Sequence, residues 1–147
     1  MIHSAGTGGL SVGSGSRWLL LAWSLFLLGG FALAGMLEPD PRGFGTHQRL
    51  GLPPCTFRAL CDIPCPSCGM TTSFAHLTRG HFAKAIEANV GGTLLALVCA
   101  AQIPWCWWSA GCGRLVGVSH PTKSLLVLLL TVVGVSAASW LYRILGG

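Results

Sequence analysis

The stretch Pro53–Arg79, PPCTFRALCDIPCPSCGMTTSFAHLTR, holds four of the chain's seven cysteines. The regions on either side consist mostly of Leu, Ala, Val, Gly and Trp and carry few charges. Sulfur-bearing and polar residues therefore gather in one place, and any chemistry of the chain is expected there. The stretch also separates one long apolar block before it from two after it, and this order of blocks decides the predicted fold.

The composition of the flanking regions predicts an integral membrane protein. The 147-residue chain is 52% hydrophobic and 9% charged, whereas an average soluble domain is about 25% charged. The apolar blocks are about twenty residues long, the length that a helix needs to cross a bilayer. Lipid is therefore the first expected partner. The nine Lys and Arg residues stand singly, which argues against nucleic acid and fits contact with lipid headgroups.

The predicted fold class is an all-α integral membrane protein with three transmembrane helices and two short interfacial amphipathic helices. The spans are expected at residues 18–37, 90–111 and 124–142. The remaining segments are predicted as a disordered tail (1–17), a Pro/Gly/Cys-rich interfacial loop (38–68), the two short helices (69–89) and a polar turn (112–123).

The first span has a second interpretation. Arg17, the apolar block and Ala32-Leu33-Ala34 together resemble a secretory signal with its cleavage site, and cleavage would remove residues 1–34. Because the block continues to Leu37, it is long for a signal core, and a retained span is preferred. Cleavage would leave two spans and place the cysteines on the extracytoplasmic side.

The distribution of basic residues favours a cytoplasmic cysteine segment. With three spans, six Lys or Arg residues share its side of the membrane and three share the other. Positively charged segments tend to stay in the cytoplasm. A cytoplasmic position favours free thiols or a bound metal, whereas an extracytoplasmic one favours disulfides.

The segment Cys65-Pro66-Ser67-Cys68-Gly69 is a Cys-x-x-Cys step that leads into a helix. Thiols at a helix N-terminus suit redox exchange, because the helix dipole favours a thiolate. The same spacing lets two sulfur atoms converge on one metal ion, while the glycine permits a tight turn. Cys55 and Cys61 would complete a set of four thiolate ligands, so a thiolate-bound metal is the one candidate cofactor.

Three interpretations of the four cysteines stay open. They form disulfides or pack as small apolar residues, they bind a metal, or they exchange disulfides with Cys65 attacking, Cys68 resolving and Cys55 and Cys61 as a shuttle pair. A structural, accessory or metal-holding role is preferred, with the thiol–disulfide oxidoreductase as the alternative. A transporter subunit is disfavoured, because no charged residue lies inside a span.

The Cys-Pro-x-Cys-Gly-x-Thr motif resembles DUF2752, a family of small bacterial membrane proteins of unknown function. The matching positions are Cys55, Cys65, Pro66, Cys68, Gly69, Thr71, Gly80 and Asn89. Three positions depart from the family pattern: Thr72 replaces a common arginine, His81 an aspartate and Val90 a proline, and Cys61 is an addition. The resemblance implies an integral membrane protein of the bacterial cytoplasmic membrane and no particular activity. Other membrane proteins are expected partners, and the sequence indicates no oligomeric state.

Overall fold

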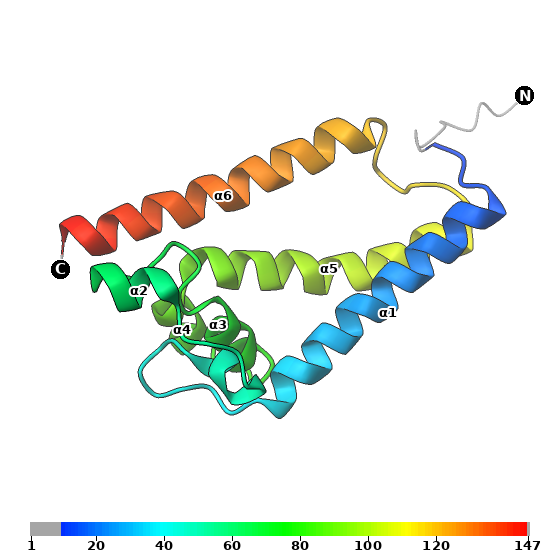
Figure 1. Cartoon of the computed structure of the whole chain (residues 1–147). Coiled ribbons are helices and arrows are strands. Elements are labelled where there is room, and N and C mark those ends of the chain that lie inside the picture. Colours follow the sequence, from blue (N-terminus) through cyan, green and yellow to red (C-terminus); the bar gives the residue numbers. More distant parts are fainter. Residues whose placement is uncertain (1–9, 147) are drawn as a thin grey trace, which may run out of the picture.

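The computed structural model describes residues 10–146, and this part of the chain is helical with no strand (Figure 1). Three long helices, α1, α5 and α6, cover Ser14–Met36, Val90–Cys112 and Pro121–Leu145. Four short ones lie between α1 and α5: η1 (Thr46–Leu50), α2 (Thr56–Cys61), α3 (Met70–Leu77) and α4 (Phe82–Ala88). The predicted all-α fold class is confirmed.

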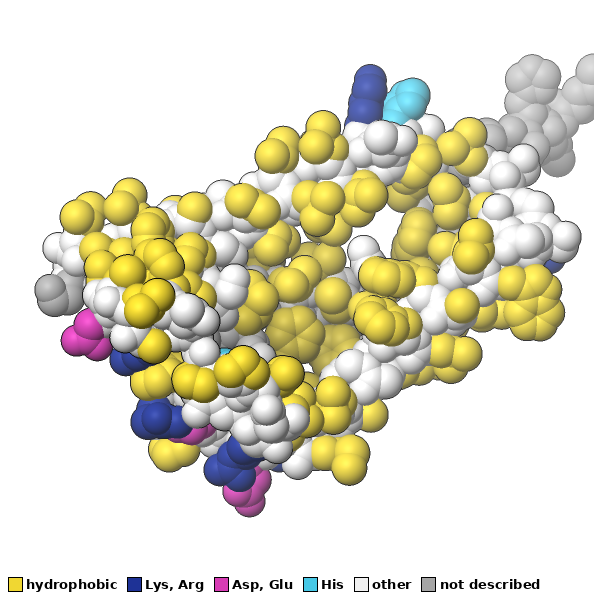
Figure 2. All heavy atoms as spheres, viewed as in Figure 1, with side chains coloured by type: hydrophobic (Ala, Val, Ile, Leu, Met, Phe, Trp, Pro, Cys, Tyr) yellow, Lys and Arg dark blue, Asp and Glu magenta, His cyan; other side chains and the backbone are white. Residues whose placement is uncertain are grey.

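The three long helices are long and apolar enough to span a membrane. They contain 23, 23 and 25 residues, and a helix of that length extends about 35 Å, more than the roughly 30 Å of a hydrocarbon core. Apolar side chains such as Leu126 and Val133 on α6 are more than half exposed. Figure 2 shows hydrophobic side chains along the long helices. These features indicate a membrane protein whose lipid-facing surface is apolar.

The short helices and the cysteine segment gather at one end of the bundle. In Figure 1, α2, α3 and α4 lie near the C-terminal end of α6, whereas the start of α1 and the α5–α6 connection lie at the opposite end. On the face drawn in Figure 2, most charged side chains also lie around the short helices. The cysteine segment therefore lies beside one end of the spans.

Polar and small residues join the long helices. Trp107 Nε1 in α5 donates to Ser24 Oγ in α1 at 2.8 Å, and Trp23 Nε1 donates to Gln102 Oε1 at 3.2 Å. Between α5 and α6, a side chain at Gly91 would overlap Ser136. Small residues and interhelical hydrogen bonds are the usual means by which helices associate in lipid.

The boundaries of several predicted segments differ from the structure. The predicted tail (1–17) is too long, because Val12 N–H donates to Gly113 O at 2.8 Å and α1 begins at Ser14; residues 1–9 lie outside the described residues. The predicted loop (38–68) contains η1 and α2. Both helices are one or two turns long, too short for a periodic apolar pattern to reveal.

Two short helices, α3 and α4, lie within residues 69–89 as predicted, and the apolar stripe of α4 faces outward. The small residues Thr72, Ser73 and Ala75 of α3 are buried, while Phe82 and Ile86 of α4 are 57% and 50% exposed. Small side chains permit close approach of helices, and the large apolar ones are left for lipid. An outward apolar face on α4 is the arrangement expected of an interfacial amphipathic helix.

Candidate functional site

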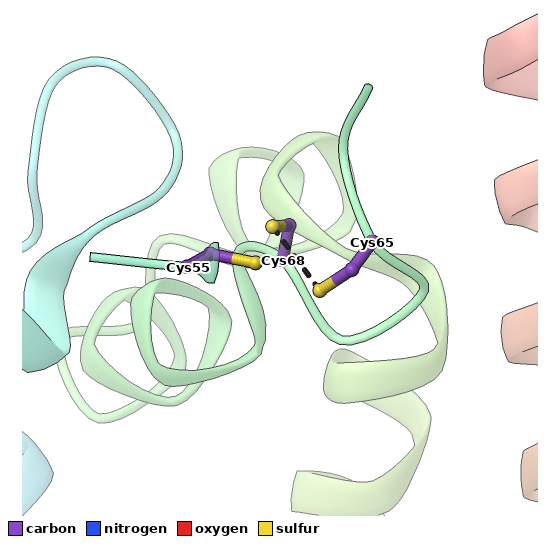
Figure 3. A group of neighbouring side chains, drawn as sticks. All are labelled: Cys55, Cys65 and Cys68. Atoms are coloured by element: carbon purple, nitrogen blue, oxygen red, sulfur yellow. Dashed lines mark hydrogen bonds between the residues drawn. The ribbon is translucent and has the colours of Figure 1, made fainter. Parts of the chain in front are cut away.

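Three cysteine side chains converge in front of the N-terminus of α3. The sulfur atoms of Cys55, Cys65 and Cys68 all lie within 4.8 Å of one another. Figure 3 shows Cys55 approaching from the segment before α2, while Cys65 and Cys68 come from the turn before α3. Cys65 Sγ and Cys68 Sγ are 3.3 Å apart, and all three thiols are free. We call these three residues the thiol triad.

The turn that carries two of the thiols is built by its own backbone. Cys68 N–H donates to Cys65 O at 3.0 Å, which closes the Cys-Pro-Ser-Cys step into a tight turn. Gly69 follows with φ of +86°, in the left-handed region that favours glycine. A side chain there would collide with the carbonyl oxygens of Ala88 and Gly43. Glycine is therefore required both by conformation and by space.

Asn89 fastens this turn to the start of α5. Its side-chain Nδ2 donates to Pro66 O at 3.0 Å and to Cys68 O at 2.9 Å, and its Oδ1 accepts from Gly92 N–H at 2.8 Å. The side chain is fully buried. One residue thus caps a membrane-spanning helix and holds the carbonyl groups of Pro66 and Cys68 in the thiol-bearing turn.

A second set of buried polar contacts joins α3 to the elements packed against it. The hydroxyls of Thr46 and Thr72 lie 2.8 Å apart, and both residues are fully buried. Ser73 Oγ lies 3.0 Å from Gly69 O and 3.1 Å from Asn89 O. Because buried polar groups need partners, these contacts fix where α3 sits relative to η1 and α5.

Contacts from more distant segments position the third thiol. Cys55 is the N-cap residue of α2, and Arg58, one turn on, stacks on Phe44 with its guanidinium carbon 3.6 Å from the ring centroid. Trp140 Nε1 in α6 donates to Pro64 O at 2.6 Å. The segment between the cysteines is therefore tied to the loop after α1 and to the last span.

The three thiols do not share one environment. Cys68 is buried, and burial raises the pKa of its thiol to about 12. The pKa of Cys55 lies below its ordinary value, chiefly because the backbone N–H of Arg58 favours the thiolate. A site with one favoured thiolate and one buried thiol suits either metal ligation or thiol exchange.

A cavity opens beside the thiol triad. Its volume is about 430 Å³, and it is lined by the three cysteines, by Arg42, Arg58 and His47, and by the first turn of α3. A ligand that occupied this cavity would contact the residues that carry the three thiols.

The other predicted site residues take different places. Cys61, the fourth predicted ligand, is exposed at the end of α2 and outside the thiol triad. Thr71 lines the cavity. Gly80 forms the turn between α3 and α4 with φ of +73° and open space around it. Of the four cysteines proposed together, the structure brings three into one group.

Sequence reasoning missed the residues that hold the site. Thr46, Phe44 and Trp140 contact the cysteine region from other parts of the chain. Thr72, noted only as a departure from the family pattern, is half of the buried hydroxyl pair. Asn89 was singled out by resemblance alone, although an asparagine just before an apolar block is a recognisable N-cap signal.

Comparison with known proteins supports the resemblance predicted from the sequence. Residues 55–103 match the model of a family described as "Protein of unknown function (DUF2752)". The match begins at Cys55 and includes the whole thiol triad and Asn89, about a third of the chain. No curated protein and no solved structure matches. Over the matched segment the chain is DUF2752-like.

Proposed function

We propose that this chain, DUF2752-like over residues 55–103, is a non-enzymatic membrane protein that holds one soft metal ion through Cys55, Cys65 and Cys68. The convergence of three free thiols within 4.8 Å carries the proposal. In tetrahedral zinc sites with Zn–S bonds of about 2.3 Å, sulfur atoms lie about 3.8 Å apart. In the thiol triad, Cys65 Sγ and Cys68 Sγ lie 3.3 Å apart, and no two of the three sulfur atoms are more than 4.8 Å apart.

The chemistry of the three side chains selects the class of metal. Thiolates favour soft or borderline ions such as Zn²⁺ and Cu⁺ over Mg²⁺ or Ca²⁺. The positive-inside tendency supports a cytoplasmic site, where thiols stay reduced. Three protein ligands leave one position for His47, water or an external ligand, since His47 lines the same cavity.

The metal content of cysteine variants tests this proposal. Chain purified in detergent from zinc-supplemented cells is expected to carry about one zinc, and Cys55→Ser, Cys65→Ser and Cys68→Ser are each expected to lose most of it. Cys61→Ser is the matched control, because Cys61 is in the same segment but exposed and outside the thiol triad. A wild-type chain without metal, or equal loss in all four variants, would refute the assignment.

A second function, thiol–disulfide exchange, is favoured by one specific observation. Cys65 Sγ and Cys68 Sγ lie 3.3 Å apart, close enough for these two thiols to be oxidised together. Their oxidation would form one S–S bond and release two protons, while two electrons reduce a disulfide of a partner protein to two thiols.

Alkylation after equilibration in glutathione buffers separates the two functions. The exchange hypothesis expects Cys65 and Cys68 to become protected together at a defined potential in metal-free protein. It also expects a Cys68→Ser variant to trap a partner on Cys65. Thiols that stay reduced at the potentials of cellular oxidoreductases, with no trapped partner, would leave metal binding as the function.

A further inference from the structure

The cavity beside the thiol triad has the electrostatic character of an anion site. Its volume of about 430 Å³ lies in the range of small-molecule pockets. Two arginines and His47 line it, and no Asp or Glu does. The lining therefore carries positively charged side chains and no carboxylate.

The two arginines in the lining differ in what already engages them. Arg42 is committed to Asp40, with Nη2 2.8 Å from Oδ2 and Nε 2.9 Å from Oδ1. Arg58 is half-buried and stacked on Phe44, yet within residues 10–146 its side chain takes part in no hydrogen bond or ion pair. A stacked guanidinium is held in place while its N–H groups stay available to a ligand.

A backbone donor also lies in the lining of the cavity. The N–H groups of Met70 and Ser73 donate to Ser67 O and Gly69 O. Thr71, in the first turn of α3, lines the cavity, and its N–H donates no hydrogen bond to any described residue. Backbone N–H groups at a helix start complement an anion, and here that of Thr71 supplements Arg58.

We propose that this cavity binds a phosphate group, with Arg58 as its main contact and the N–H group of Thr71 as a further donor. A guanidinium matches two phosphate oxygens at once. The residues that line the cavity belong to the short helices and their connections, which lie at one end of the spans (Figure 1). The phosphate therefore comes from an anionic lipid headgroup or from a soluble phosphate compound. The site requires no metal and goes beyond the metal-holding role.

Native mass spectrometry of the detergent-purified chain tests the proposal with three probes: short-chain phosphatidylglycerol, short-chain phosphatidylcholine and inorganic phosphate. The wild type is expected to bind phosphatidylglycerol or inorganic phosphate more tightly than phosphatidylcholine. Preference for phosphatidylglycerol over inorganic phosphate identifies a lipid source, and the reverse identifies a soluble one. No binding of phosphatidylglycerol or inorganic phosphate overturns the proposal.

Variants show whether Arg58 is the contact. Arg58→Gln is expected to weaken binding at least tenfold, and Arg58→Lys less, because the charge is kept but the planar fork is lost. Arg49→Gln is the matched control, since Arg49 pairs with Glu38 at 2.9 Å outside the cavity lining. Equal binding by Arg58→Gln and wild type overturns the proposal.

The metal content of the same variants keeps the two proposals separate. If Arg58→Gln loses metal while binding phosphate normally, Arg58 serves the thiolates instead, and the phosphate site is refuted. If it loses phosphate binding and keeps its metal, the phosphate site is supported. Thermal unfolding of each variant shows that the fold is intact, and Arg58→Lys carries the comparison if Arg58→Gln does not fold.

Discussion

Replacing Asn89 separates the positioning of the thiol triad from the stability of the fold. In Asn89→Ser the side chain still caps α5, because a serine oxygen accepts from the helix start. It is too short to replace the Nδ2 bonds to Pro66 O and Cys68 O, which measure 3.0 and 2.9 Å. The substitution therefore frees the thiol-bearing turn while leaving the helix cap in place.

The magnitude follows from the two carbonyl groups that lose their donor. The Cys68 bond is buried and the Pro66 bond partly buried, and leaving a buried acceptor without a partner costs about 1–3 kcal/mol. Together they predict about 2–4 kcal/mol of lost stability. Residues that orient metal ligands typically contribute a factor of about 10–100 to metal affinity, and a loss in that range is expected here.

The control is Ser73→Ala, which removes a hydroxyl from the same buried cluster without touching Pro66 or Cys68. This change is expected to cost about 1 kcal/mol of stability and little metal affinity. Zinc competition with a chromophoric chelator gives the affinity, and thermal unfolding in detergent gives the stability. A fall in affinity that merely tracks stability in both variants, or none in Asn89→Ser, would refute the positioning role.

Three further predictions concern the backbone, the topology and the protons of the site. Gly69→Ala should destabilise the fold by well over about 2 kcal/mol, because a side chain would meet two carbonyl oxygens, whereas Gly80→Ala, also at positive φ but in open space, should cost only about 1–2 kcal/mol; comparable melting temperatures would contradict this. Cys61 ends α2 and Cys112 ends α5, and both are exposed; these helix ends lie at opposite ends of the bundle (Figure 1). In intact cells, a variant that keeps only Cys112 should react with an impermeant maleimide from outside, and a variant that keeps only Cys61 should not. Labelling of both variants from one side would refute the three-span topology. Burial raises the pKa of Cys68 to about 12, so a bound metal ion must displace the proton of this thiol. The affinity for zinc should therefore fall about tenfold, for each proton released, with every unit of decreasing pH. Chelator competition at pH 8 and pH 6 measures this, and equal zinc affinities at the two pH values would contradict it.

The three long helices and the break between α3 and α4 could be predicted, because each depends only on the local sequence. A helix that faces lipid must be apolar along about twenty residues, so α1, α5 and α6 are visible in the sequence even though their ends differ by a few residues. Gly80 separates α3 from α4 in the same visible way. These features need no knowledge of tertiary contacts.

The membership of the thiol triad could be predicted only in part. Cys65 and Cys68 meet because a turn of four residues, Cys65 to Cys68, brings them together, and their spacing shows this directly. Cys55 and Cys61 lie at opposite ends of α2, and the path of the chain decides which one reaches the turn. That path depends on contacts such as Arg58 on Phe44, between residues with no shared pattern in the sequence.

Apolar periodicity could not predict which residues of α3 and α4 are buried, for a physical reason. Periodic apolar residues indicate a buried face only when water surrounds the protein. Around Phe82 and Ile86 lipid is an equally good solvent, so Ala85 and Ala88 pack inside and the larger residues face outward. Reading small residues as the contact face would have given the observed orientation.

The most direct test of the metal-holding role is X-ray absorption at the zinc edge of the purified, zinc-loaded chain in detergent. We expect three sulfur neighbours at about 2.3 Å and one lighter atom, nitrogen or oxygen, at about 2.0–2.1 Å. The Cys61→Ser variant should give the same spectrum. A first shell made only of nitrogen and oxygen, or one that loses a sulfur when Cys61 is replaced, would contradict the assignment of Cys55, Cys65 and Cys68 as the ligands.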